Sequence, residues 1–312
     1  MIKLLKSVKS SMNRRALGVL HFASVMSLLV VSCEAPEPRS PSESRDLGAN
    51  HGSADSEDNE NVDDPLGSNG RWEEVTLTGA PEPRKGSTIL SAGNQILVLG
   101  GENGVRDFSD GMLYDPASDG WEDLLLSDVI SARFLMGGIH SKINNLIFLW
   151  GGAKFVNVSQ SRGDRLNDGC VMDLGSYECN SLMSGPLSPR DGHCMAANDD
   201  RLLIWGGENE GTQIGDGALY NFREKLWQYI PRDFGGGSPA AREEHFCMWS
   251  PKHGKFLIHG GFGQAVYTDT WMLDPKNREW ETATIAGTQL PPRRGITYGY
   301  TDEYLIMVGG RA

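Results

Sequence analysis

The chain has 312 residues, of which 39% are hydrophobic and 22% charged, a balance typical of a folded globular protein. The formal net charge is -12, and -9 of it falls after residue 70. An acidic domain lacks the basic surface that binds a phosphate backbone, which argues against nucleic acid as a partner. The 39 glycines and 8 tryptophans stand among short apolar runs without a sustained helical period, and this pattern predicts an all-β fold.

Residues 1–32 have the pattern of an export signal. A basic start is followed by the apolar stretch Ala16–Val31, which is short for a membrane-spanning helix. The stretch ends in Val-Val-Ser-Cys at residues 30–33, which resembles the lipobox of bacterial lipoproteins. That resemblance implies cleavage before Cys33 and attachment of lipid, palmitate included, to its thiol. The alternatives are an ordinary signal peptide or a membrane anchor with a chance cysteine, and Met12 is an alternative start.

Residues 33–70 are expected to form a lipidated N-terminus followed by a disordered acidic linker. The segment is made of Pro, Ser, Asp, Glu, Asn and Gly with almost nothing apolar, so burial cannot offset its ordering entropy. Several acyl chains would hold the protein durably at a membrane surface. Glu34 follows the cysteine, and by resemblance to enterobacterial lipoproteins this favours the outer membrane of a bacterial cell envelope.

The remaining chain, 71–312, repeats itself with a period near fifty. Each of five apolar runs ends in a glycine pair, and the pairs are spaced by 51, 55, 54 and 49 residues. An arginine stands 16 or 18 residues before the first glycine of each pair. The glycine pairs begin at Gly100, Gly151, Gly206, Gly260 and Gly309, and the arginines are Arg84, Arg133, Arg190, Arg242 and Arg293.

Further positions recur after the first four glycine pairs. An aspartate is followed five residues later by Asp or Asn, and six residues beyond that by Trp or, once, Cys179. The aspartates are Asp110, Asp168, Asp216 and Asp269. This arrangement resembles the kelch repeat, in which four strands make one blade of a β-propeller. Sheets of this kind bury both faces only by stacking radially, so the resemblance implies a propeller over 71–312.

About five blades are predicted, one of them incomplete. The chain reaches only two strands into the fifth repeat, whereas Trp72–Val75 has the look of an isolated fourth strand. By resemblance to kelch propellers, this segment is expected to join the last blade and close the ring. An open ring is the alternative. The recurring arginines and aspartates are expected to pair near one rim, in a structural role.

Four cysteines remain after Cys33. Cys170 and Cys179 flank one predicted hairpin, where a disulfide or two buried thiols are equally compatible with the pattern. Cys194 and Cys247 occupy equivalent positions in adjacent repeats beside His193 and His245. A disulfide is possible there, and a zinc or copper site is a weaker alternative. We therefore predict no metal, cofactor or catalytic set.

The rim that carries the second-to-third-strand loops is the predicted binding surface, because the chain is most elaborate there. Residues 153–167 are an insertion, and the segment 231–241 is rich in glycine. A tolerated loop extension is the alternative. The candidate rim residues are Phe155, Arg162, Asp164, Arg165, Phe234, Arg190, Arg242, His193 and His245.

Two functions fit this sequence. The first is a non-enzymatic module, tethered to a membrane, that binds a protein or glycan. The second is a carbohydrate-active enzyme, mutarotase-like or oxidase-like, because some kelch proteins are enzymes. Carboxylates, His or Arg converging at the channel mouth would favour the enzyme, and a broad aromatic rim would favour the binding module.

Overall fold

The computed structural model describes residues 3–6, 71–124, 129–141, 143–155, 163–182, 185–233, 235–284, 291–300 and 305–311. These residues form strands and turns, and none of them lies in a helix that could span a membrane. They belong to two compact units, one holding strands β1 and β2 and the other everything from Thr76 onward. The export signal, Cys33 and the acidic linker lie outside the described residues, apart from β1.

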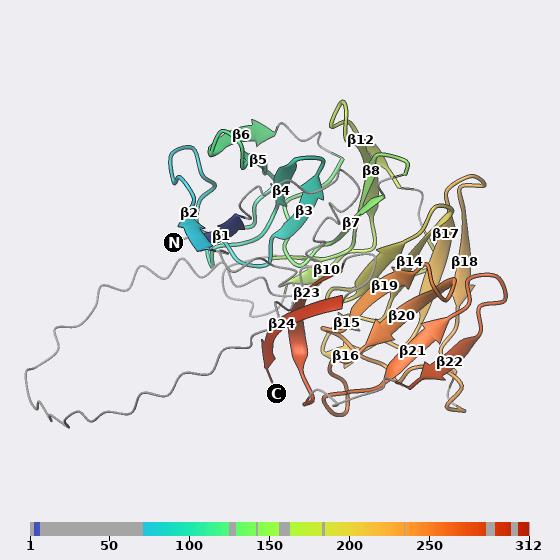
Figure 1. Cartoon of the computed structure of the whole chain (residues 1–312). Helices are drawn as coiled ribbons and strands as arrows, with labels where there is room; N and C mark the ends of the chain where they lie inside the picture. Colours follow the sequence, from blue (N-terminus) through green and yellow to red (C-terminus); the bar gives the residue numbers. More distant parts are fainter. Residues whose placement is uncertain are drawn as a thin grey trace, which may run out of the picture. The chain divides into compact units, whose positions relative to one another are not determined.

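Four antiparallel sheets of four strands each make up most of the second unit (Figure 1). Blade 1 contains β3 (Thr88–Ala92), β4 (Gln95–Leu99), β5 (Gly111–Asp115) and β6 (Gly120–Leu124). Blade 2 contains β7 (Gly137–Ser141), β8 (Leu146–Trp150), β11 (Gly169–Asp173) and β12 (Cys179–Ser181). Blade 3 contains β13 (Cys194–Ala197), β14 (Arg201–Trp205), β17 (Gly217–Asn221) and β18 (Leu226–Ile230). Blade 4 contains β19 (Phe246–Ser250), β20 (Lys255–His259), β21 (Thr270–Leu273) and β22 (Trp280–Ala283).

Local sequence explains why each blade is a meander. The Asp or Asn that ends or directly follows each third strand accepts backbone N–H groups from the turn, as in Ala117 to Asp115 at 2.8 Å and Arg223 to Asn221 at 3.0 Å. Such Asx turns join neighbouring antiparallel strands within a few residues. The apolar second strands are buried along most of their length, and those of blades 2 and 3 lie between two neighbouring sheets.

Successive blades pack face to face, with the first strands β3, β7, β13 and β19 adjacent in that order. We call each packed boundary a seam. The seam between blades 1 and 2 holds one apolar cluster, and the 2–3 and 3–4 seams each hold another. The all-β kelch-type architecture expected from the repeats is therefore confirmed.

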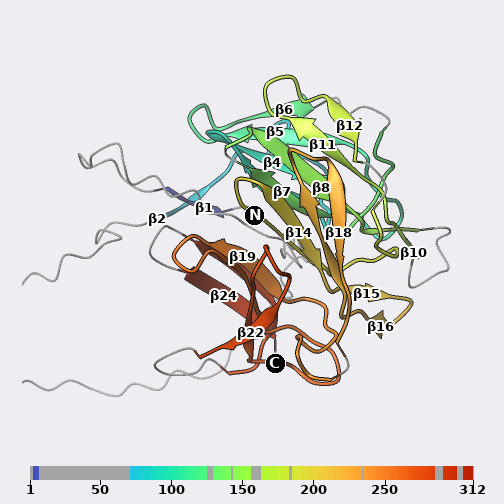
Figure 2. The same cartoon turned by 90° about the vertical axis from the view of Figure 1, so that its right-hand side faces the viewer.

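Two small hairpins and a fifth sheet complete the second unit. β9 (Ala153–Lys154) pairs with β10 (Asp164–Arg165), and β15 (Glu208–Asn209) with β16 (Thr212–Gln213), the latter visible beyond the end of β14 in Figure 2. The fifth sheet contains β23 (Arg294–Tyr300) and β24 (Leu305–Arg311), and it follows blade 4 through a backbone hydrogen bond from Gly295 to Glu244 of 3.2 Å.

The expected closing strand has a different partner. β2 (Arg71–Glu74) pairs with β1 (Lys3–Lys6) in a separate two-stranded sheet, and the fifth sheet has two strands among the described residues. The expectation that Trp72–Val75 joins the last blade is thus not what the structure contains. A short strand offers backbone hydrogen bonds to any free edge, and its sequence does not specify which edge it meets.

Candidate binding rim

A buried arginine holds the loop end of every complete blade. Arg133 donates to the carbonyl of Gly151 (3.2 Å) and, through both terminal nitrogens, to the two carboxylate oxygens of Asp168 (2.7 and 2.9 Å). Arg242 makes the same contacts to Gly260 (2.9 Å) and Asp269 (2.6 and 2.8 Å). The arginine, glycine pair and aspartate of one repeat therefore form a clamp within one blade.

The clamps of blades 1 and 3 have the same partners. Arg84 bonds Gly100 and Asp110, and Arg190 bonds Gly206 and pairs with Asp216 at 2.8 Å. The hydrogen bond from Arg133 lowers the pKa of Asp168, so the carboxylate stays ionised opposite the guanidinium. The structural role expected for these residues is what the geometry supports.

The second glycine of the first three pairs joins one blade to the next. Its N–H donates to the carbonyl of the following arginine, as in Gly101 to Arg133 at 2.9 Å and Gly152 to Arg190 at 3.0 Å. Gly152 has a φ of +92°, and a Cβ there would lie 2.7 Å from the carbonyl oxygen of Phe134. Glycine is therefore required at this joint both for its backbone conformation and for space.

The insertion in blade 2 is anchored to both neighbouring blades. Arg165 on β10 forms ion pairs with Asp191 (2.8 Å) and with Glu208, which belong to blade 3. Directly after β9, the N–H of Phe155 donates to Asp107 of blade 1 (2.7 Å), and its ring stacks on Phe134 at 5.0 Å. The base of the hairpin β9–β10 thus connects three consecutive blades.

Charged side chains gather where these loops meet. Lys85 pairs with Glu102 at 2.8 Å, and Arg311 of the fifth sheet pairs with Glu244 at 2.8 Å. Gln213 donates to Glu243 at 3.1 Å. Burial raises the pKa of Glu243, and burial likewise raises that of Asp107. Glu102 and Glu244 thus have cationic partners, whereas Glu243 and Asp107 accept hydrogen bonds from uncharged groups.

The sequence-predicted rim residues divide into four groups, and the histidines are the fourth. Phe155, Asp164 and Arg165 lie on the hairpin β9–β10, with Asp164 exposed. Arg190 and Arg242 are fully buried in their clamps and so do not face a ligand. Arg162 and Phe234 lie outside the described residues.

His193 and His245, also predicted for the rim, are buried in the seams. Their rings pack edge-on against Trp150 (5.1 Å) and Trp205 (5.2 Å). Burial lowers the pKa of each imidazole to about 3, with the charge of the neighbouring arginine adding to the effect. Both histidines are therefore neutral packing groups near neutral pH.

Sequence reasoning missed Asp107, Asp191 and Glu208 as rim residues. A signal was present, because the residue after each clamp arginine bridges to the residue after each glycine pair: Asp191 exchanges backbone hydrogen bonds of 3.1 and 2.8 Å with Glu208. Their partner Arg165 could not be found this way, since it comes from an insertion outside the repeat.

Both cysteine pairs form disulfides in the structure. Cys170 and Cys179 join β11 to β12 within blade 2, with their Cα atoms 5.7 Å apart. Cys194 and Cys247 join β13 to β19 across the 3–4 seam, with Cα atoms 5.8 Å apart. His259 instead shares a hydrogen bond of 2.8 Å with Thr270. The alternative of a metal held by Cys194 and Cys247 is therefore replaced by a crosslink between blades.

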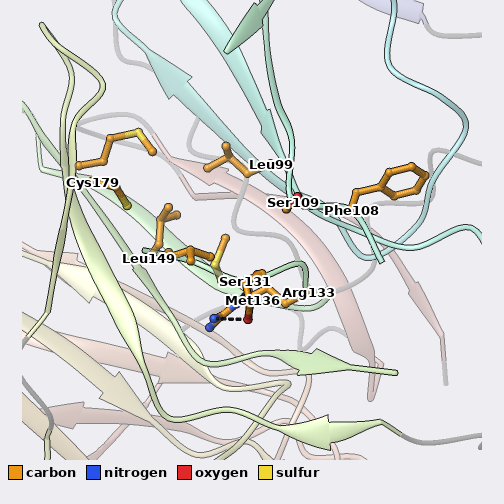
Figure 3. A pocket seen from close by; sticks show the side chains of 11 residues that line it. Leu99, Phe108, Ser109, Ser131, Arg133, Met136, Leu149 and Cys179 are labelled. Atoms are coloured by element: carbon orange, nitrogen blue, oxygen red, sulfur yellow. Dashed lines mark hydrogen bonds between the residues drawn. The ribbon is translucent and has the colours of Figure 1, made fainter. Parts of the chain in front are cut away.

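A small apolar pocket opens into the 1–2 seam (Figure 3). Its enclosed volume is about 10 Å³, close to the space that one water molecule needs, and in its wall Arg133 donates to the hydroxyl of Ser131 at 3.0 Å. Its walls are Leu99, Gly100, Phe108, Ser109, Ile130, Ser131, Arg133, Met136, Leu149, Met172 and Cys179.

These blades, clamps and glycine joints define a kelch-type propeller, and comparison with known proteins agrees. The family model described as the KLHDC2/KLHL20/DRC7 Kelch-repeats domain matches residues 127–310, and the Kelch motif model matches residues 83–124. The chain belongs to the kelch-repeat family.

Several curated proteins are similar to this chain. The dynein alpha chain of the flagellar outer arm from Chlamydomonas reinhardtii is 26% identical over 68% of this chain and 5% of its own length. The Rab9 effector protein with kelch motifs from Xenopus laevis is 26% identical over 62% of this chain and 54% of its own length. N-(sulfonatooxy)prop-2-enimidothioate sulfolyase from Thlaspi arvense is 20% identical over 77% of this chain and 74% of its own length. The chain thus spans about half or less of the first two relatives.

Proposed function

We propose that this protein is a membrane-tethered binding module, with its propeller attached through lipidated Cys33 and its loop rim presented to a protein or glycan on a bacterial cell envelope. The kelch repeats indicate a protein-interaction module. The Val-Val-Ser-Cys sequence at 30–33 and the acidic, apolar-poor segment after it support the tether. The absence of aspartate after Cys33 supports the outer membrane.

The observation that carries the binding role is the anchored hairpin β9–β10. A tolerated loop extension needs no contacts with its neighbours, whereas this one is fixed by Arg165 on one side and by the contact of Phe155 with Asp107 on the other. Recognition surfaces gain affinity when their elements are held in place before the partner arrives. The hairpin base has this property.

The rim also offers mixed chemistry to a partner. The side chains of Asp110 and Asp168 remain about half exposed, at 47% and 55%, although each pairs with a buried arginine. Val105 and Arg106 are exposed beside them, and Phe134 and Phe155 contribute a stacked aromatic pair. The rim therefore has both converging charged groups, which are expected of an enzyme, and aromatic surface, which is expected of a binding module. The partners of the charged groups favour binding over acid–base chemistry.

The rim can be tested by quantitative affinity capture from envelope extracts and by a glycan array. We expect Arg106→Glu combined with Asp164→Arg to abolish capture of whatever the wild-type protein retains. Lys252→Glu, in the turn after β19 at the opposite strand ends, is the matched control and should retain it. Equal capture by all three proteins would refute a rim site.

The tether has a separate test. The mass of the mature N-terminus of membrane-extracted protein should correspond to an acylated peptide beginning at Cys33. Cys33→Ala should give a soluble, unmodified protein. An unmodified wild-type N-terminus would remove the tether and leave the rim proposal in place.

An enzyme acting on carbohydrates is the second candidate, because the raised pKa values of Asp107 and Glu243 would suit a general acid. Reducing sugars incubated with the protein and followed by NMR would reveal mutarotation or oxidation. If the protein has such an activity and Glu243→Gln loses it, the enzyme proposal replaces the binding proposal. No turnover above that in buffer would exclude these two reactions.

A further inference from the structure

One position in blade 2 breaks a pattern of its neighbours. The third and fourth strands of blades 1 and 3 place a tyrosine directly opposite a tryptophan, and these rings lie 4.9 and 5.0 Å apart. Blade 2 places Met172 opposite Cys179 at the same register. An aromatic pair is thus replaced by two sulfur-bearing side chains. The aromatic pairs are Tyr114–Trp121 and Tyr220–Trp227.

Two more sulfur atoms belong to the same place. Cys170 lies two residues before Met172, so both side chains project from the same face of β11, and its disulfide partner is Cys179. Met136 enters from the connection before β7 and lines the same pocket as Met172 and Cys179 (Figure 3). All four residues are buried and belong to one cluster in the 1–2 seam.

The surroundings of these sulfur atoms are apolar. Leu99, Ile130 and Leu149 form much of the pocket wall, and no carboxylate is among its lining residues. The one charged group among the lining residues, the guanidinium of Arg133, is paired with Asp168. Oxygen-preferring cations such as Mg²⁺ or Ca²⁺ find no ligands here, whereas thiolates and thioethers select soft metals.

We propose that, once the Cys170–Cys179 disulfide is reduced, this seam binds a single Cu(I) ion through the two cysteine sulfurs with thioether ligands from Met136 and Met172. Reduction by a dithiol transfers two electrons and two protons to the disulfide, and the dithiol becomes a cyclic disulfide. Cu(I) then displaces thiol protons to solvent without any change in its own oxidation state. The ion occupies the space that an aromatic pair fills in blades 1 and 3.

The test uses full-length protein carrying Cys33→Ala, so that the thiol at residue 33 does not compete. The protein is reduced, freed of reductant without oxygen, and titrated with Cu(I) against the chromophoric chelator bicinchoninate. We expect Met136→Leu combined with Met172→Leu, which nearly conserves volume, to lower the Cu(I) affinity by about tenfold or more. Met195→Leu, a buried methionine of the 2–3 seam, should not change it.

Two further measurements keep the result specific. Replacing Cys194 and Cys247 by alanine removes the other cysteine pair and should leave the high-affinity site intact. X-ray absorption at the copper edge should show sulfur neighbours alone in the wild-type protein. Equal affinity in the double leucine variant, with circular dichroism showing that all variants are folded, would overturn the proposal. So would loss of the site with Cys194 and Cys247.

Discussion

The seam between blades 1 and 2 differs from the two seams that follow it. At the 2–3 and 3–4 seams a tryptophan that precedes the glycine pair packs against a histidine from the next blade. Leu99 and Met136 occupy the equivalent positions at the 1–2 seam, and the pocket lies beside them. Flexible aliphatic and thioether side chains fill the seam less completely than interlocking rings. One repeat architecture therefore supports both a closed and a recessed boundary.

Clamps are present at all three seams. Breaking a clamp should therefore cause the largest loss of stability, and the loss should be similar for each seam. Asp168→Ala and Asp269→Ala each leave a fully buried arginine without its carboxylate. We expect each to lower the free energy of unfolding by about 3–5 kcal/mol. Urea denaturation measures this loss. A much smaller loss in Asp168→Ala alone would show that the 1–2 seam depends less on its clamp.

The disulfides sharpen the comparison, since one crosses a closed seam and the other lies within blade 2. Cys194 and Cys247 close a segment of 53 residues, whereas Cys170 and Cys179 close one of 9. Chain entropy predicts a loss of about 4 kcal/mol for the first and between about 2 and 3 kcal/mol for the second when each pair is replaced by alanine. Melting temperatures of the two variants should follow this order, and the reverse order would indicate that native contacts, not loop closure, dominate.

The buried histidines make the closed seams sensitive to acid. Each imidazole has a folded pKa of about 3, below its ordinary value, so the unfolded chain binds more protons between about pH 6.5 and 3. The stabilisation is complete above pH 6.5 and is lost as pH falls. Each histidine should contribute a slope of about 1.4 kcal/mol per pH unit within that range.

Replacement of one such histidine tests this slope. His245→Gln should flatten the dependence of the unfolding free energy on pH, measured by urea denaturation from pH 7 to pH 4. His253, which is exposed and bonded to Ser250, is replaced in the control variant His253→Gln. An unchanged slope in His245→Gln would mean that this imidazole is protonated in the folded protein.

The smallest effect concerns the edge of a clamp. The hydroxyl of Tyr229 donates to Asp216 at 2.6 Å, and this bond raises the pKa of Tyr229 to about 12. Because Tyr229 is partly exposed, Tyr229→Phe should lower the unfolding free energy by only about 1 kcal/mol. Alkaline difference spectroscopy should also show the loss of one late-titrating phenol.

Much of this fold could be predicted because the repeats fix it. Glycine pairs, clamp arginines and turn aspartates recur at set distances, so their pairing and the four-stranded blades follow from spacing. The partner of β2 could not be predicted, because the sequence of a short strand does not specify which sheet edge the strand pairs with. The domain boundaries, the lipid tether and the undescribed residues Arg162 and Phe234 remain predictions.

The rim was less accessible to sequence reasoning. Its location followed from the insertion at 153–167, but the side chains of Arg190, Arg242, His193 and His245 point into clamps and seams instead of outward. A polar residue beside a glycine pair reads the same in sequence whether it is buried or exposed. Whether such a side chain is buried depends on the neighbouring blade, which is about fifty residues away in the sequence.

The joint between blades is made by main-chain atoms: the N–H of a second glycine meets the carbonyl of the next arginine. Because these bonds use no side chain, they can persist when the tip of the loop after a glycine pair changes in length and composition. The binding surface can therefore vary between related proteins while the association of the blades is conserved. The tip of the hairpin β9–β10, beyond its anchored base, is a natural position for grafting new peptide sequences onto this scaffold.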